Sequence, residues 1–211
     1  MFNKLLMLFA FLFIFGLNAQ NNAIIIDHSC IDLTKIPETY INKAKQTIVM
    51  CYGHTSYGSQ IVTGMKLLND RTASIYKYNS GAGSLTLKDN SPAGDLGDRY
   101  LWPELTREYL ANNPAINTVM WSWEKQLSAA PFEYVDIYLS SMDALEKEYP
   151  KVKFIYMTGA TDGTGIGGTL NICNEQIRQY CRNNNKILYP KIMLVLTPHT
   201  VIVQINHLNF H

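Results

Sequence analysis

Short runs of apolar and β-branched residues alternate with helical patterns along this chain, and this alternation constrains the fold more than any other feature. The runs are nearly continuous in hydrophobicity, which is typical of strands buried on both faces of a sheet. Strands separated by helices form βαβ units with right-handed crossovers and a mainly parallel sheet. The sequence therefore predicts an α/β fold. The expected strands are Ala23–Asp27, Gln46–Tyr52, Ala73–Tyr78, Asn117–Trp123, Lys153–Thr158 and Lys186–Tyr189.

Two helical patterns lie between the later strands. The stretch from Glu133 to Tyr149 places its apolar residues on one stripe and is closed by Pro150. A second pattern covers Thr169–Asn183. In open parallel sheets, ligands bind beyond the carboxyl ends of the strands, so we expect functional residues directly after each strand.

The N-terminal segment predicts export. Lys4 precedes an uncharged apolar run, Leu5–Phe15, that is too short to span a bilayer comfortably. We interpret residues 1–19 as a signal peptide cleaved after Ala19, which implies a secreted or periplasmic protein with no stable membrane span after cleavage. An uncleaved N-terminal anchor is the alternative.

Charge and cysteine spacing narrow the function classes. The chain has 18 basic and 17 acidic residues scattered along its length, so no basic surface for nucleic acid is expected. The four cysteines, Cys30, Cys51, Cys173 and Cys181, do not follow a zinc-binding spacing. We predict no metal, no cofactor and no firm disulfide pairing.

A nucleophile-like motif follows the second expected strand. The stretch 53–60, Gly-His-Thr-Ser-Tyr-Gly-Ser-Gln, ends a buried strand and begins a helix, where a serine hydroxyl is exposed and helical amides face developing negative charge. Ser56 is the preferred nucleophile, and a helix N-cap is its structural alternative. His54 is close enough in sequence to contact the hydroxyl, although a catalytic base normally comes from elsewhere in the fold. In the Gly-rich stretch 81–98, Gly81 and Gly94 could supply oxyanion amides or could simply form turns.

These motifs resemble a group of secreted bacterial SGNH (GDSL-like) hydrolases over roughly residues 23–189. The resemblance is carried by residues 24–37, 52–60, Trp121-Ser-Trp123, Tyr156–Gly159 with Asp162–Gly165, and 176–189. It implies a flavodoxin-like three-layer sandwich and an early serine nucleophile, which matches Ser56. It also implies an oxyanion hole shared with a Gly and an amide side chain, and a histidine near the C-terminus.

The chain departs from that pattern at three places. Glu124-Lys125-Gln126 replaces the expected turn after Trp123, which leaves Gln126 as the amide donor there. Ala160 stands where a histidine is expected. Residues 190–211 form an apolar tail with one charged residue and three of the five histidines, His199, His207 and His211. We interpret the tail either as a truncation or frame change in the gene, or as a native edge strand or hairpin whose histidine serves as base.

Trp121 and Trp123 admit two interpretations. Flat aromatic faces can line a sugar-binding cleft, while core packing is the commoner fate of tryptophan at a strand end. The resemblance implies a serine ester hydrolase of SGNH type acting on acyl esters, with acylated carbohydrates as the expected substrates. Because the C-terminal acid and histidine of that pattern are not identifiable, we expect its activity to be low or absent. The alternative is a noncatalytic carbohydrate-binding or remnant module that lacks the base.

Overall fold

The computed structural model describes residues 22–30 and 32–189 of the chain. The predicted signal peptide and the tail 190–211, with its three histidines, lie outside the described residues. The expectations about cleavage, export and a base in the tail therefore stay predictions.

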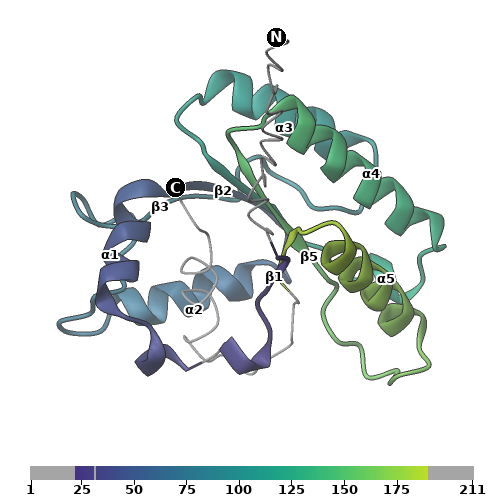
Figure 1. Cartoon of the computed structure of the whole chain (residues 1–211), viewed down its shortest axis with the longest axis horizontal. Coiled ribbons are helices and arrows are strands. Elements are labelled where there is room, and N and C mark those ends of the chain that lie inside the picture. The colour runs from purple at the N-terminus through teal and green to yellow at the C-terminus, as the bar shows by residue number, and fades with distance from the viewer. Residues whose placement is uncertain (1–21, 31, 190–211) are drawn as a thin grey trace, which may run out of the picture.

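A single six-stranded sheet, with every pair of neighbouring strands parallel, forms the centre of the described structure (Figure 1). Its strand order is β1-β6-β5-β4-β2-β3. All of its strands are short, and the central ones are almost completely buried, as continuous apolar sequence predicts. The strands are β1 (Ile24–Ile25), β2 (Val49–Gly53), β3 (Thr86–Asp89), β4 (Thr118–Trp121), β5 (Lys153–Met157) and β6 (Ile187–Tyr189).

Helices cover both faces of the sheet. Helices α1 and α2 lie on one face, and α3, α4 and α5 pack side by side on the other (Figure 1). This arrangement confirms the predicted α/β class and the flavodoxin-like three-layer sandwich. The helices are α1 (Glu38–Thr47), α2 (Ser59–Asn69), α3 (Leu101–Asn112), α4 (Glu133–Glu148) and α5 (Thr169–Asn183).

The sheet has a topological switch point between β2 and β4. The chain leaves β2 through α2 to reach β3 on one side, and it later returns through α3 to form β4 on the other side of β2. In doubly wound sheets, the crevice outside such a switch point is where ligands bind. At this edge Gly53 pairs with Trp121, and the Ser122 amide donates to the Gly53 carbonyl over 2.9 Å.

The third strand is not where the sequence pattern placed it. Residues 73–78 form an irregular connection in which only Tyr78 makes an isolated bridge, to Leu85. The strand that pairs with β2 is Thr86–Asp89, inside the Gly-rich stretch 81–98, where no strand was expected. The expectation was wrong because the apolar run at 73–78 is only partly buried, whereas Leu87 is 3% exposed within the edge strand.

Aromatic side chains fill the core between the sheet and the α3–α5 layer. Trp102, Trp121, Trp123, Tyr138 and Tyr156 form a chain of tilted and edge-on ring contacts with centroid distances of 5.0 to 6.0 Å. Such geometries suit the quadrupoles of aromatic rings. Burial of a large apolar side chain contributes roughly 1.5 to 3 kcal/mol, so this cluster is a main source of the stability of this layer.

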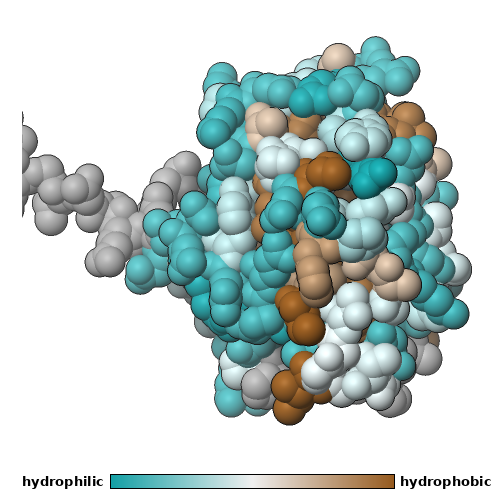
Figure 2. All heavy atoms as spheres, turned by 90° about the vertical axis from the view of Figure 1, so that its right-hand side faces the viewer, coloured by the Kyte–Doolittle hydropathy of each residue, from teal (hydrophilic) through white to brown (hydrophobic). Residues whose placement is uncertain are grey.

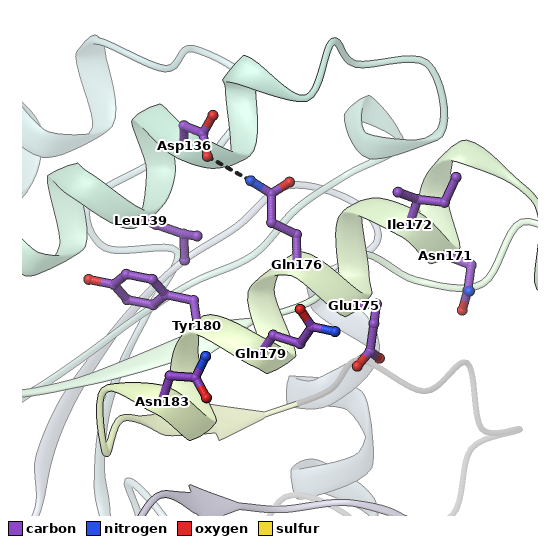
Figure 3. Close-up of a pocket in the computed structure, with 9 residues that line it drawn as sticks. All are labelled: Asp136, Leu139, Asn171, Ile172, Glu175, Gln176, Gln179, Tyr180 and Asn183. Atoms are coloured by element: carbon purple, nitrogen blue, oxygen red, sulfur yellow. Dashed lines mark hydrogen bonds between the residues drawn. The ribbon is translucent and has the colours of Figure 1, made fainter.

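On the outer face of the α4–α5 region, apolar residues form an irregular band through the middle, and hydrophilic residues surround it (Figure 2). A groove of about 580 Å³ runs between α4 and α5, and the Gln176 amide crosses it to donate to Asp136 over 2.6 Å (Figure 3). Its remaining lining mixes apolar, amide and acidic side chains: Leu139, Asn171, Ile172, Glu175, Gln179, Tyr180 and Asn183. Among the described residues, no helix combines the length and apolar character that crossing a bilayer would require.

Candidate functional site

Ser56 lies in the turn between β2 and α2, at the switch point. Helix α2 begins at Ser59, and its N-cap is Gly58, which provides no side-chain cap. The interpretation of Ser56 as a helix N-cap is therefore wrong, because its hydroxyl reaches across to another loop. Ser56 Oγ donates to Glu124 Oε1 over 2.5 Å, and the serine itself is exposed. An accessible hydroxyl held by a carboxylate is an arrangement suited to a nucleophile and its base.

Glu124 follows β4 and accepts three hydrogen bonds from the Ser56 turn. Besides the Ser56 hydroxyl, Glu124 Oε2 accepts from Thr55 Oγ1 over 2.7 Å and from the Tyr57 amide over 3.0 Å. Glu124 is an acceptor at each contact, which is how an ionised carboxylate behaves. These hydrogen bonds hold the loop after β2 against the loop after β4, although Ser56 and Glu124 are 68 residues apart in the sequence.

A second carboxylate, Asp95, joins the same polar cluster. Asp95 Oδ2 lies 2.6 Å from Thr55 Oγ1, while Asp95 Oδ1 accepts from the Gly97 amide over 2.7 Å and from Gln126 Nε2 over 3.2 Å. Gln126 Oε1 in turn accepts the Glu124 amide over 2.8 Å. The Gln126 side chain therefore binds the loops after β3 and β4 to each other rather than pointing freely toward a ligand.

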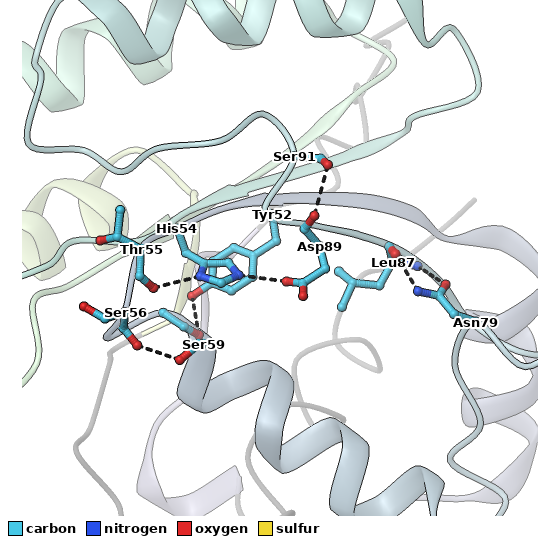
Figure 4. Close-up of polar contacts among 10 residues, drawn as sticks. Tyr52, His54, Thr55, Ser56, Ser59, Asn79, Leu87, Asp89 and Ser91 are labelled. Carbon is cyan, nitrogen blue, oxygen red and sulfur yellow. Dashed lines mark hydrogen bonds and ion pairs between the residues drawn. The ribbon is translucent and has the colours of Figure 1, made fainter.

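His54 is directed away from the Ser56 hydroxyl. Its Nε2 lies 2.7 Å from Asp89 Oδ1, at the end of β3, and its Nδ1 lies 2.8 Å from the Thr55 carbonyl oxygen (Figure 4). Both ring nitrogens are thus committed to other partners. The structure gives His54 a place beside the candidate nucleophile but not the geometry of its base.

The two glycines proposed for the oxyanion lie in different places. Gly94 precedes Asp95 in the loop after β3, at the same sheet edge as Ser56. Gly81 lies before β3, and because β2 and β3 are parallel, that places it at the opposite edge of the sheet. Gly81 is a turn residue with φ of +94°, so its assignment to an oxyanion hole is corrected.

Trp121 and Trp123 are core residues. Each is 1% exposed, and each indole N–H donates inside the protein, Trp121 to Thr106 Oγ1 over 2.9 Å and Trp123 to the Met157 carbonyl over 3.1 Å. Neither presents a face to solvent on which a sugar could stack. Position 53 requires glycine, because a β-carbon there would stand 2.2 Å from the Trp121 ring.

Sequence reasoning missed Asp89, Asp95 and Glu124. Glu124 directly follows β4 at the switch point, and this placement alone could have nominated it. It was instead interpreted as a departure from the expected family turn. Asp89 was missed because its strand was not recognised.

No model of a known protein family matches this chain, and no curated protein is similar to it at a significant level. Within the described residues, no group of three or more histidine, cysteine, aspartate or glutamate side chains is arranged to hold a metal ion. The geometry of the Ser56 site is therefore the basis for inferring a function.

Proposed function

We propose that this chain is an acyl-ester hydrolase of SGNH type in which Ser56 is the nucleophile and Glu124 is its general base. The observation that carries the proposal is the 2.5 Å hydrogen bond from Ser56 Oγ to Glu124 Oε1 across the switch point. Carboxylates serve as general bases when they lie within hydrogen-bond reach of the proton they accept. The proposed enzyme is exported and acts on small acyl esters, with acylated carbohydrates as the favoured class.

The reaction proceeds through an acyl-enzyme. Ser56 Oγ attacks the acyl carbon while its proton passes to Glu124, and the carbon–oxygen bond to the alcohol breaks as that proton moves to the departing alkoxide. Water then attacks the Ser56 ester, Glu124 accepts the proton of that water, and the carboxylic acid leaves as the proton returns to Ser56. A covalent intermediate of this kind divides one difficult step into two easier ones.

Backbone amides complete the site. The amides of Ser56 and Gly94 donate to no other described residue, and both lie in loops at the sheet edge that carries the nucleophile. They are the donors we assign to the oxyanion. Because a carboxylate is a weaker base than an imidazole, we expect modest turnover that persists at mildly acidic pH.

The noncatalytic carbohydrate-binding alternative gains no support from Trp121 and Trp123, because both rings are buried. In our proposal, Glu124 supplies the base whose absence favoured that alternative. An exposed serine hydroxyl that is held by a carboxylate favours a catalytic site over a cleft that only binds sugars.

The test is hydrolysis of a short-chain aryl ester and covalent labelling by a fluorophosphonate probe, using the protein without residues 1–19. We expect labelling at one serine and ester hydrolysis, both abolished in Ser56→Ala. Ser140→Ala is the matched control, because Ser140 lies on α4 and its hydroxyl donates to the Ile137 carbonyl of the same helix. Labelling and hydrolysis that survive unchanged in Ser56→Ala, or that are absent from folded protein, would overturn the proposal.

A further inference from the structure

His54 is buried between β2 and the start of α2. The residue is 7% exposed, its ring lies 4.6 Å from the Tyr52 ring, and Gly58 closes against it from the α2 side. A buried histidine with both ring nitrogens at hydrogen-bond distance from oxygen atoms is held in one orientation. Figure 4 shows the ring between the Thr55 carbonyl and Asp89.

The hydrogen-bond partners fix where the protons lie. A carbonyl oxygen only accepts, so Nδ1 carries a proton and donates it to Thr55. One further proton lies between Nε2 and Asp89 Oδ1, whichever atom holds it. The His54–Asp89 pair is therefore neutral as a whole, and it offers no free nitrogen to Ser56.

The Thr55 carbonyl is the point at which this pair acts on the site. The same oxygen accepts the amides of Gly58 over 3.1 Å and Ser59 over 3.3 Å, which form the entry to α2. The Thr55 hydroxyl lies against both carboxylates of the polar cluster, and the next residue is Ser56. Because Ser56 directly follows Thr55, the orientation of the Thr55 peptide determines the position of the Ser56 hydroxyl relative to Glu124.

We propose that His54 and Asp89 are positioning residues, which fix the Thr55–Ser56 turn so that the Ser56 hydroxyl stays aligned with Glu124. This inference rests on the proposed function of Ser56 and adds to it a chain of contacts from Asp89 on β3 to the nucleophile. A displacement of about 1 Å at a reacting group can lower a rate by about 100-fold.

The experiment compares wild type, Asp89→Ala, His54→Ala and His54→Asn under conditions where each is folded. The asparagine amide can replace Nδ1 as a donor to the Thr55 carbonyl, whereas alanine cannot. Asp70→Ala is the matched control, because Asp70 pairs with Lys66 at the far end of α2. The first measurement is the rate of fluorophosphonate labelling at Ser56.

We expect labelling to slow by about 10- to 100-fold in Asp89→Ala and His54→Ala, to recover substantially in His54→Asn, and to stay unchanged in Asp70→Ala. Recovery in the asparagine variant separates positioning from a general loss of stability. Equal labelling rates in wild type and both alanine variants would overturn the inference while leaving the Ser56 nucleophile intact.

A second measurement keeps the inference testable if wild type is not labelled. The Tyr57 amide donates to Glu124 Oε2, so its hydrogen exchange reports the alignment of the turn independently of catalysis. We expect faster exchange of the Tyr57 amide in Asp89→Ala and no change in Asp70→Ala. Nitrogen NMR of the His54 ring should show a protonated Nδ1 in wild type. Unchanged Tyr57 exchange in Asp89→Ala would contradict the positioning role.

Discussion

Gly58 lies directly against His54, so closely that a β-carbon at residue 58 would stand 2.2 Å from the His54 β-carbon. The Gly58→Ala change must therefore displace the ring, the turn or both. We expect Gly58→Ala to lower the free energy of unfolding by about 1 to 3 kcal/mol, as overpacked cores do, and to slow labelling of Ser56. Gly167→Ala is the control, because a β-carbon there would meet open space. Equal melting temperatures for the two variants would contradict this account of the packing.

The contact between Ser56 and Glu124 predicts the behaviour of Glu124→Gln. The amide keeps the size of the side chain but cannot accept a proton from Ser56, so we expect hydrolysis to fall by about 100- to 10,000-fold. The expected melting temperature is close to that of wild type, because the residue is only partly buried. Steady-state kinetics on folded protein provide the measurement. Retention of more than half of the wild-type rate would remove Glu124 from the mechanism.

The pH dependence distinguishes a glutamate base from a histidine base in the tail. Glutamate side chains titrate near pH 4.3 and histidine side chains near pH 6.5 in model peptides. A base must be deprotonated to act, so a carboxylate base predicts hydrolysis that persists to lower pH than an imidazole base would allow. A rate that drops through about pH 6.5, and that is lost in one of His199→Ala, His207→Ala or His211→Ala, would assign the base to the tail instead.

Sequence patterns predicted the layers of this fold because they report burial. Four of the six expected strands overlap well with β2, β4, β5 and β6, and the expected helix Thr169–Asn183 matches α5. The edge strand β3 was missed because half of it faces solvent, so Lys88 and Asp89 interrupt its apolar pattern. The first expected strand, Ala23–Asp27, was longer than β1, of which two residues pair with β6.

The site was harder to predict because its partners come from different loops. Ser56 was identified from its position between a strand and a helix, which is a local signal. Its contact with Glu124 depends on β4 pairing with β2, and no local pattern specifies that pairing. His54 was considered as a base because it lies two residues from Ser56 in the sequence. The direction of its ring depends on Asp89, which lies in a strand that was not recognised.

The buried position of Trp123 predicts a structural effect of mutation. Removal of this indole would leave a cavity beside Tyr138 and would leave the Met157 carbonyl without its donor. We expect Trp123→Ala to lower the free energy of unfolding by about 3 to 5 kcal/mol, measured by denaturant titration. Tryptophan emission of wild type should not respond to added soluble sugars. A saturable response that is absent from Trp123→Phe would restore the sugar-cleft interpretation.

The cysteines should differ in reactivity toward thiol reagents. All four are free, Cys30 is half-buried, and burial raises the pKa of the Cys51 and Cys181 thiols to about 12. Since the thiolate is the reactive form, we expect one thiol of the native protein to react promptly at pH 8, and the other three only on unfolding. Loss of the prompt reaction in Cys30→Ala is the control. Prompt modification of two or more thiols would contradict the packing of β2 and α5.

Asp143 on α4 gives the stability a dependence on acidic pH. Hydrogen bonds from Lys147 and then Lys186 lower the pKa of the Asp143 carboxyl below its usual value of 3.8. The ionised pair therefore stabilises the fold above that value, and the contribution disappears as the pH falls through the lowered pKa. We expect Asp143→Asn to lower the free energy of unfolding by up to about 1 kcal/mol at pH 7 and by less at pH 2, measured by urea unfolding. An equal loss at both pH values would mean that charge is not the cause.

Because the site lies at the switch point, we expect it to form late in folding. Ser56 and Glu124 are separated by 68 residues, and the segment between them contains α2, β3, α3 and β4. Contacts between distant parts of a chain must overcome the entropy of closing a long loop, and they form slowly. A chain in which only the N-terminal half is ordered would carry the Ser56 turn without its carboxylate. Under the proposed function, such a chain would not hydrolyse esters. Ser56 would become reactive only when β2 pairs with β4.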